Sequence, residues 1–484
     1  MRHFKSLTLA LAAIVAAASM ISCSSNNQDR VIKTDIPARP AGQEDVLGLR
    51  LPAIDTIRIG FVGLGGRGSF ALYRYLQVPW TKIVALCDLE QDRIQKNVDF
   101  LKENGIEGVS TYTGDDGYKE LCKREDIDLV YICTNWQSHT PIALEALNNG
   151  KNVACEVPSA TSLEECWALV NAAEKNRRHC MMLENCCYDF FELSSLEMAR
   201  KGVFGEVMHA EGAYCHSLLD YWDGYWKNWR LDFNSKHKGD VYPTHGLGPV
   251  CQVLNIHRGD RLKTLVAMDT KSPNGIKSVK RFQGEDMPDF QNGDITSTLI
   301  STEKGKTILI EHDVMNPRPY NRMYQLVGTD GFAAKYPVEQ ISLSKEQADS
   351  LGLFVNEYNG KGEANMEERD RIDFHGALPE ELVERLRSRY QNPVLTTDLE
   401  ELAKKVGGHG GMDFIMDYRL IYCLHNGLPL DMDVYDLAEW CCIGELGAIS
   451  IANGNAPVEV PDFTRGAWNK IDGFKYAFAD GSMK

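Results

Sequence analysis

The chain has 484 residues, of which 43% are hydrophobic and 25% are charged, and its net charge is −16. This is the composition of a globular protein, and the length predicts two or three domains with ample core. Because the chain is acidic and has no basic block, the composition argues against nucleic acid and anionic membrane surfaces as partners.

The N-terminus has the pattern of an export signal. Arg2 and Lys5 precede an apolar run over residues 7–21, which is too short and wrongly flanked for a stable anchor helix. We interpret residues 1–22 as a signal peptide and residues 23–56 as a polar tether and irregular arm. The signal ends in "MISC", which resembles a bacterial lipobox. That resemblance implies a lipid on Cys23 and an exported, membrane-anchored lipoprotein; plain secretion with another cut site is the alternative.

The other cysteines do not form the pattern of a disulfide framework. Cys87, Cys133 and Cys155 lie in apolar runs, where cysteine acts as a small hydrophobe, and no CxxC motif occurs. We expect no structural metal and few or no disulfides, although an oxidising compartment would allow one or two pairs.

From residue 57 the sequence alternates apolar strands with amphipathic helices. Strands are expected near residues 56–62, 81–88, 126–134, 151–157 and 180–186, and helices near residues 69–78, 92–105, 139–150 and 162–179. This alternation predicts a parallel sheet covered by helices on both faces, an α/β Rossmann domain over residues 57–184.

After residue 184 the pattern changes to longer, alternating strands with few helices between them. Strands are expected near residues 205–216, 263–270, 294–302, 306–313 and 323–329, and helices near residues 410–427 and 434–454. We therefore predict an α+β substrate-binding domain over residues 185–484 with a largely antiparallel open sheet.

The motif "GLGGRG" places Gly63, Gly65 and Gly68 in GxGxxG spacing between a strand and a helix. Gly63 permits the tight turn, Gly65 lets the backbone approach a pyrophosphate, and Gly68 lets helix and strand pack closely. Asp88 ends the second strand, where a carboxylate binds ribose hydroxyls and disfavours a 2′-phosphate, so NAD is expected rather than NADP. A glycine turn without a cofactor is the alternative.

The other strand ends should line the same crevice, because ligands bind beyond the carboxyl ends of parallel strands. Their candidate residues are Trp136, His139, Glu156, Val157 and Asn185, each of which could instead cap or pack.

A second cluster surrounds "GDVYPTHGLGP", which holds Tyr242 and His245 in tight backbone. The preceding "YWDGYWKNWRLDF" is rich in aromatic rings, which suit the apolar faces of sugars. The alternatives are a capped helix start for the first stretch and a core edge or oligomer contact for the second. His409, in "GGHGGMD", is expected to cap a helix, with a role in the site as the alternative.

The order of these motifs resembles the Gfo/Idh/MocA oxidoreductase superfamily, with one departure. Dehydrogenases of that superfamily carry Glu-Lys-Pro at the fifth strand, and their lysine moves a proton; here the sequence is "EVP", and Val157 cannot. The resemblance also allows a homo-oligomer by analogy.

Within the superfamily the chain is similar to glycoside hydrolase family 109, the NAD-dependent α-N-acetylgalactosaminidases. The motifs that carry this resemblance are "NWQSH", "EVP", "GAYCH", "NWRLDF", "GDVYPTHGLGP", "NRMYQLVGT" and "GGHGGMDF". The resemblance implies NAD contacts from Gly66, Arg67, Asp88, Trp136, Gln137, Ser138, His139, Glu156, Val157 and Asn185. It implies substrate contacts from Tyr214, Arg230, Tyr242, Pro243, Thr244, His245 and Tyr324.

The resemblance also implies a mechanism: oxidation at C3 of the sugar, loss of the C2 proton, elimination of the C1 oxygen, addition of water and re-reduction. Histidine and tyrosine are suitable proton carriers, and arginine can stabilise developing negative charge. The catalytic candidates are His245, Tyr242, Tyr214, Tyr324 and Arg230, without a proton assigned to each. The substrate would be a glycan with terminal N-acetylgalactosamine; the alternatives are a sugar dehydrogenase or epimerase and a non-catalytic sugar-binding lipoprotein.

Overall fold

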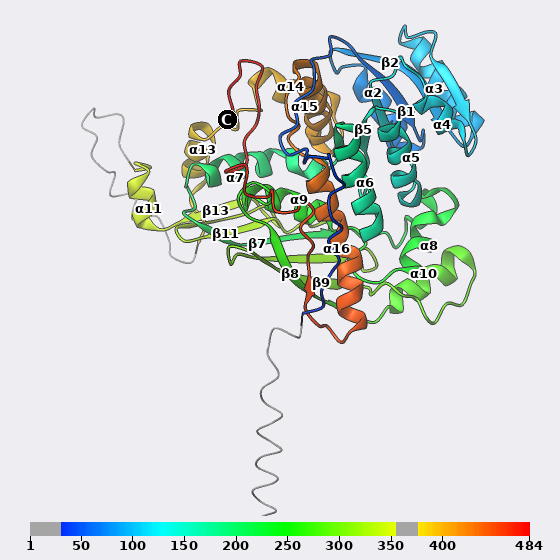
Figure 1. Ribbon diagram of the computed structural model, residues 1–484. Helices are drawn as coiled ribbons and strands as arrows, with labels where there is room; N and C mark the ends of the chain where they lie inside the picture. The colour runs from blue at the N-terminus through cyan, green and yellow to red at the C-terminus, as the bar shows by residue number, and fades with distance from the viewer. Residues whose placement is uncertain (1–30, 355–375) are drawn as a thin grey trace, which may run out of the picture.

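The structure, a computed structural model, describes residues 31–354 and 376–484 (Figure 1). The expected signal peptide and Cys23 lie outside these ranges, so the lipoprotein assignment stays a prediction. Within them, no helix combines the length and the apolar character needed to span a membrane. The thirteen cysteines in these ranges are buried free thiols.

The first domain contains a six-stranded parallel sheet in the order β3-β2-β1-β4-β5-β6, which confirms the Rossmann-type prediction. Its elements are β1 (Ile57–Val62), α2 (Gly66–Tyr75), β2 (Thr81–Asp88), α3 (Gln91–Glu103), β3 (Ser110–Thr113), α4 (Gly117–Cys122), β4 (Leu129–Ile132), α5 (Trp136–Asn148), β5 (Asn152–Cys155), α6 (Leu163–Asn176) and β6 (Cys180–Met182). The sequence pattern missed β3, because "STYT" is a half-exposed edge strand without an apolar run. The inner strands β4 and β5 are wholly buried, as strands covered on both faces should be.

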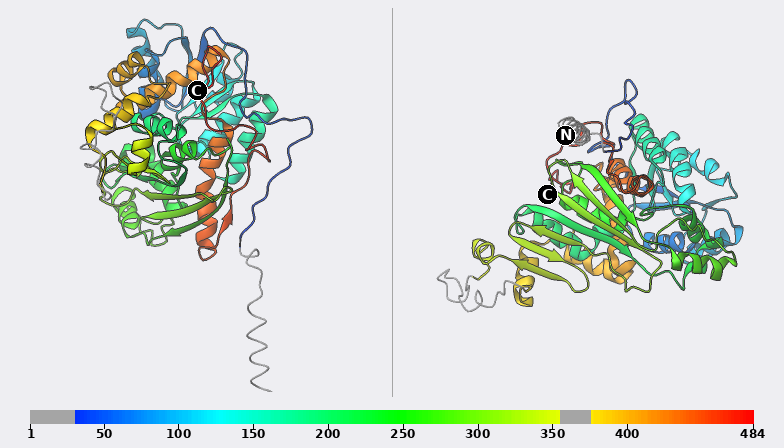
Figure 2. Two further views of the ribbon diagram at one scale, coloured as in Figure 1. Left: turned by 90° about the vertical axis from the view of Figure 1, so that its left-hand side faces the viewer. Right: turned by 90° about the horizontal axis from the view of Figure 1, so that it is seen from below.

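The second domain begins with η2 (Asn185–Tyr188) and is built on an eight-stranded sheet in the order β13-β12-β11-β7-β10-β9-β8-β14. Its strands are β7 (Val207–Cys215), β8 (Leu262–Asp269), β9 (Thr296–Thr302), β10 (Thr307–Asp313), β11 (Gln325–Gly328), β12 (Gly331–Ala334), β13 (Gln340–Leu343) and β14 (Val458–Glu459). The sheet is largely antiparallel, as predicted, but β7 and β10 run parallel. Its strands lie in front of the helices when the molecule is seen from below (Figure 2, right).

The helices of this domain are more numerous than the sequence pattern indicated. They are α7 (Phe190–Arg200), η3 (Trp222–Gly224), η4 (Trp226–Asn228), α8 (Trp229–Lys236), α9 (Thr244–Val253), α10 (Pro273–Gln283), α11 (Lys345–Ser350), α13 (Glu380–Arg389), α14 (Thr397–Val406), η6 (His409–Gly411), α15 (Met412–Asn426) and α16 (Val434–Ala452). Several of them are short and polar, so no long apolar period marks them in the sequence. The two predicted C-terminal helices are confirmed as α15 and α16.

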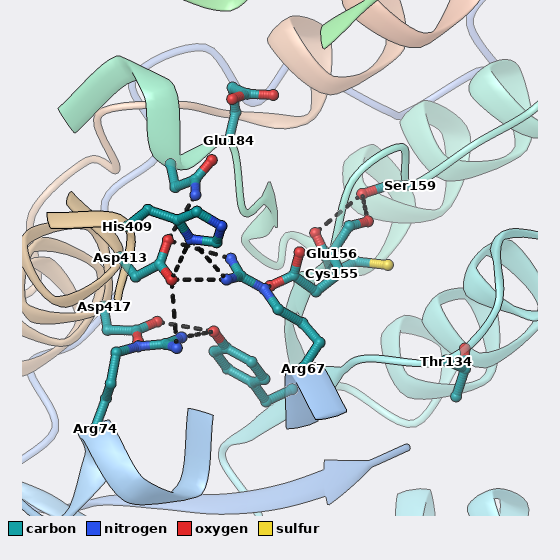
Figure 3. A network of polar contacts seen from close by, with 12 residues as sticks. Arg67, Arg74, Thr134, Cys155, Glu156, Ser159, Glu184, His409, Asp413 and Asp417 are labelled. Atoms are coloured by element: carbon teal, nitrogen blue, oxygen red, sulfur yellow. Dashed lines mark hydrogen bonds and ion pairs between the residues drawn. The ribbon is translucent and has the colours of Figure 1, made fainter. Parts of the chain in front are cut away.

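The C-terminal helices tie the two domains together. α16 packs on both α6 and β8 (Figure 1). A buried ion pair of 2.7 Å joins Arg74 of α2 to Asp417 of α15 (Figure 3). The N-terminal arm adds a further tie, because Ile32 bridges to Val458 and Arg39 pairs with the buried Glu174. These contacts fix the second domain over the carboxyl ends of the parallel strands, where the candidate site lies.

Candidate functional site

The glycine turn is built as the motif requires. A Cβ on Gly68 would lie 1.9 Å from the carbonyl oxygen of Gly63, so only glycine lets α2 pack this closely on the turn. Gly63 itself has a φ of 91° and faces the Cys133 carbonyl. A Cβ on Gly66, by contrast, would meet no atom within 4 Å, so the start of α2 has open space beside it.

That open space suits a dinucleotide. The first turn of α2 has neither a side-chain cap nor an acidic residue, so its N–H groups and dipole are available to phosphates. The Asp88 carboxylate is fixed at the end of β2, where it accepts the Leu64 N–H at 2.6 Å and the Glu90 N–H at 2.9 Å. A cleft of about 440 Å³ runs past Asp88 and the glycine turn to Thr134 and Ser138. The residues present therefore fit the pyrophosphate and ribose of NAD.

The predicted cofactor residues of α5 divide into two groups. Ser138 lines the cleft, together with Thr134 and Asn135, which sequence reasoning did not single out. Gln137 points outward, and the buried His139 ring lies between the carbonyl oxygens of Thr134 and Pro158. His139 therefore does not line the cleft. It fixes the backbone at Thr134 and Pro158 through its hydrogen bonds.

Arg67 lies at the centre of a polar network between the two domains (Figure 3). Its guanidinium contacts Glu156 at 2.6 Å and Asp413 of α15 at 2.7 Å. Asn185 donates to the same Asp413 carboxylate at 2.6 Å, and His409 lies 3.0 Å from it. Burial would raise the pKa of Asp413, but Arg67 and the other partners hold it well below its usual value.

The structure corrects the role expected of His409. The N-cap residue of α15 is Gly411, and His409 bonds a side chain instead of the helix backbone. Its Nδ1 atom also lies 3.5 Å from Arg67, so His409 belongs to the network beside the glycine turn. A histidine among four glycines gives no sequence signal for that long-range contact.

The side chains that contact one another next to the cleft at Asp88 and Ser138 are those of Tyr214, Tyr242 and His245. Their ring centroids lie 4.4 Å (Tyr214–Tyr242), 5.3 Å (Tyr214–His245) and 4.9 Å (Tyr242–His245) apart. The Tyr242 hydroxyl is 3.4 Å from Nε2 of His245, and its ring lies 5.5 Å from that of Trp136 on α5. Burial raises the pKa of both tyrosines, so their hydroxyls carry protons at neutral pH.

The glycines of "GDVYPTHGLGP" explain how these side chains meet. A Cβ on Gly246 would lie 2.5 Å from the Ala213 nitrogen, so only glycine lets α9 approach β7 and bring His245 to Tyr214. A Cβ on Gly248 would lie 2.9 Å from Cγ of Glu184. Pro243 and Thr244 begin α9 and are buried, so they hold the backbone that carries the two reactive side chains.

The carboxylate of Glu184 is the functional group that sequence reasoning missed. Its Oε1 atom lies 2.7 Å from Nδ1 of His245 and accepts the Cys186 N–H at 3.1 Å. Burial disfavours the charge, but the His245 ring outweighs burial and lowers the pKa of Glu184. An ionised carboxylate only accepts hydrogen bonds, so Nδ1 carries the proton and Nε2 is left as a base.

Arg230 supplies positive charge to the same cluster. Its guanidinium lies over the rings of Trp136, Tyr225 and Tyr242 at 4.9, 5.1 and 4.7 Å. Nη1 donates to the Tyr225 hydroxyl at 2.6 Å, whereas Nε and Nη2 are buried without a hydrogen-bond partner among the described residues. Buried donors of this kind are costly unless a ligand accepts from them.

The structure does not bring Tyr324 to this cluster. Its hydroxyl bonds Ser195 of α7 at 2.8 Å, and its ring packs on Phe191 in the core. Tyr320 lies nearer: its ring meets His216 edge-on at 5.4 Å, and His216 stacks at 5.5 Å on Tyr214. The half-exposed Tyr320 is therefore the tyrosine of this segment that borders the site.

Three potential metal ligands also meet here. One ligand atom each from Glu184, Cys186 and His245 lies within 4.8 Å of the others. The hydrogen bond between Glu184 and His245 already satisfies two of them, and Cys186 Sγ lies 3.0 Å from the Arg322 guanidinium, whose charge disfavours a cation. The geometry therefore fits a proton relay better than a metal centre.

The fold and the cleft define a protein of the NAD-binding oxidoreductase type. The family model described as "Oxidoreductase family, NAD-binding Rossmann fold" matches residues 57–184. A solved structure of levoglucosan dehydrogenase with NADH and L-sorbose aligns with a TM-score of 0.61 at 17% identity, covering 84% of this chain and 100% of that one. The cofactor is NAD.

The chain belongs to glycosyl hydrolase family 109. The model described as "Glycosyl hydrolase 109, C-terminal domain" matches residues 188–470. Glycosyl hydrolase family 109 protein 1 of Phocaeicola vulgatus is 58% identical over 93% of this chain and 92% of its own length. The protein of the same name from Bacteroides fragilis is 53% identical over 99% of both chains. The protein is therefore a glycoside hydrolase that uses NAD.

Proposed function

We propose that the protein removes terminal α-N-acetylgalactosamine from glycans by a transient oxidation of the sugar. The observation that carries this proposal is the buried Glu184–His245 pair, which abuts Tyr242 beside the NAD cleft. A conventional glycosidase instead places two carboxylates on either side of the scissile bond. Glu184 is wholly buried behind His245, and Glu156 is held by Arg67, so neither is presented for that role.

When bound, NAD would supply a reversible oxidation of the sugar hydroxyl at C3. Asp88 and the start of α2 would hold its ribose and phosphates in the cleft that Ser138 and Trp229 also line. A ketone at C3 acidifies the hydrogen at C2, so the chain must accept protons at both positions. Val157 cannot do so, which separates this site from the Glu-Lys-Pro dehydrogenases.

The proton work falls to His245 and its neighbours. Nε2 of His245 is the base, and the Glu184 carboxylate stabilises the imidazolium that forms when Nε2 takes a proton. The Tyr242 hydroxyl lies within 3.4 Å of Nε2 and can pass protons between that base and a sugar hydroxyl. Tyr214 keeps its proton at neutral pH and can donate to the departing oxygen.

Arg230 is suited to the negative charge that develops when the C2 proton leaves. Two of its nitrogen atoms are buried donors without a hydrogen-bond partner in the described part of the chain, and aromatic rings surround them. Donors fixed in advance where charge develops cost no reorganisation during the reaction. The surrounding rings also match the apolar face of a pyranose.

Release of p-nitrophenol from p-nitrophenyl α-N-acetylgalactosaminide tests the proposal. The protein as isolated should release it without added cofactor, should lose this activity when NAD is stripped, and should recover it when NAD is restored. Accumulation of NADH from free sugar would instead indicate a sugar dehydrogenase. Sugar binding without turnover would indicate a binding protein.

A further inference from the structure

One wall of the NAD cleft comes from the second domain, and the residues of this wall have no part in the proposed proton transfer. The segment over residues 221–229 contributes Tyr221, Tyr225, Trp226 and Trp229 to the lining of the cleft. We infer that Trp226 of this segment and Arg93 of the first domain form a clasp over the adenosine end of NAD, which keeps the cofactor bound between turnovers.

Arg93 places a positive charge where the negatively charged pyrophosphate of NAD is expected. Its Nη1 atom lies 3.8 Å from Oδ1 of Asp88, and a Cβ on Gly65 would lie 3.8 Å from the same nitrogen. The guanidinium therefore lies between the ribose-binding carboxylate and the glycine turn. In this fold the adenosine ribose and the pyrophosphate pass through that position.

The charge of Arg93 is also available to a ligand. Arg67, the other arginine at the turn, is engaged by Glu156 and Asp413 at 2.6 and 2.7 Å. Within the described ranges, the carboxylate contact of Arg93 is the 3.8 Å approach to Asp88, which is long for an ion pair. A pyrophosphate beside the turn would draw Arg93 toward it.

Trp226 reaches the same point from the second domain. The Arg93 guanidinium lies 5.6 Å from the centre of the indole, within the range of a cation–π contact. Lys227 and Asn228 have φ values of 53° and 54°, and these two left-handed residues turn the chain so that both Trp226 and Trp229 line the cleft. A conformation that ordinary residues avoid is retained here where it aims a ring at the cofactor.

The segment is anchored on both sides of Trp226. The side chain of Trp222 is fully buried, and Asn228 donates to the Phe282 carbonyl at the end of α10. Trp229 meets Trp136 of α5 edge-on at 5.2 Å, which joins the segment to the first domain. Figure 1 shows α8 below α5 of the first domain, with α10 next to α8. An anchored ring in the wall of the cleft would hinder the departure of the adenosine end.

The test measures release of NAD and not turnover. Protein purified with its NAD is mixed with excess alcohol dehydrogenase and ethanol, which reduce released NAD, and absorbance at 340 nm reports the release rate. Trp226→Ala should speed release by at least about fivefold, because stacking of one ring on a base is worth about that factor or more. Arg93→Gln should also speed release, because glutamine removes the charge that the Trp226 ring contacts and that a pyrophosphate would attract.

Trp226→Phe keeps a ring in place and should release NAD at close to the wild-type rate, which guards against a general folding defect. Trp80→Ala is the matched control. Trp80 directly precedes β2, is partly exposed, stacks on His425 and does not line the cleft. Wild-type release from both Trp226→Ala and Arg93→Gln would overturn the clasp. The inference rests on NAD binding alone, so it stands or falls independently of the proposed sugar substrate.

Discussion

The Nδ1 atom of His245 lies 2.7 Å from Oε1 of Glu184, a carboxylate whose side chain has no exposed surface. The two residues are 61 positions apart, one after the last parallel strand and one in the first turn of α9. Their hydrogen bond joins the two domains at the point where the cofactor cleft meets the aromatic cluster. It also fixes which imidazole nitrogen faces the site.

Glu184→Gln should therefore reduce turnover strongly without removing NAD. The amide keeps the shape but not the charge, so the imidazolium loses its stabilisation and the tautomer is no longer enforced. We expect kcat to fall by about 10²–10⁴, the range of general base catalysis, while KM changes little. Hydrolysis of the p-nitrophenyl glycoside measures this, with Glu107→Gln, on an exposed loop, as the control. Wild-type turnover in Glu184→Gln would show that His245 needs no carboxylate partner.

Removing single tyrosine hydroxyls should distinguish the tyrosines of the site from the tyrosine of the core. Tyr214→Phe and Tyr242→Phe should each lower kcat by at least about tenfold, because both hydroxyls belong to the proton relay. Tyr324→Phe should leave kcat unchanged and cost about 1 kcal/mol of stability, the usual worth of a buried hydrogen bond such as that to Ser195. Kinetics and thermal unfolding of the three variants check this. Loss of activity in Tyr324→Phe alone would reverse the assignment.

Arg230→Lys should retain the charge and lose the function. A lysine cannot place two parallel donors in the pocket, and its ammonium is more strongly hydrated than a guanidinium. We expect kcat/KM to fall by about 10²–10³, the cost of removing a donor at a developing anion. Arg281→Lys, at an exposed ion pair with Asp220, is the matched control and should behave as wild type. Equal activity of the two variants would contradict a role in charge stabilisation.

The buried pair of His257 and Glu439 makes stability depend on pH. Nε2 of His257 lies 2.7 Å from Oε2 of Glu439; burial lowers the pKa of the imidazole, but the carboxylate outweighs burial and raises it to about 9. Because the folded-state pKa lies above that of the unfolded chain, this contribution is complete below about pH 6.5 and is lost as pH rises through about 9. We expect the free energy of unfolding to fall by about 2–3 kcal/mol over that interval.

Denaturant unfolding at pH 6 and pH 9 measures this loss. The double variant His257→Gln/Glu439→Gln removes both charges, so no buried charge is left unpaired and the pH dependence should be smaller by the amount that this pair contributes. A double variant with the same pH dependence as the wild type would show that the pair does not titrate in this range.

The fold class and the NAD cofactor could be predicted because their signals are local. The glycine turn, Asp88 and the apolar strands each lie in one short stretch, and their spacing requires the Rossmann arrangement. Tyr242 and His245 were also found locally, because they lie three positions apart at the start of α9. Glu184 was missed, although the adjacent Asn185 was named, because its partner lies in another domain and Gly248 makes room for it.

Tyr324 was named through the family resemblance, and the structure places its hydroxyl on Ser195 in the core instead. Met323 and Tyr324 have φ values of 56° and 47°, a left-handed turn that breaks the alternation of side chains just before β11. Strand periodicity cannot tell which face a residue takes after such a turn. Tyr320, three residues before that turn, borders the site instead. The contacts of Arg67 and His409 with Asp413 could not be predicted from local sequence patterns either.

The fate of the C2 hydrogen during hydrolysis in deuterated water tests the central claim most directly. Transient oxidation at C3 requires that the C2 proton leave and be replaced from solvent, so the released N-acetylgalactosamine should carry deuterium at C2, as mass spectrometry and proton NMR would show. Hydrolysis at full rate with the C2 hydrogen retained would contradict the account, because the glycosidic bond would then break without oxidation of the sugar.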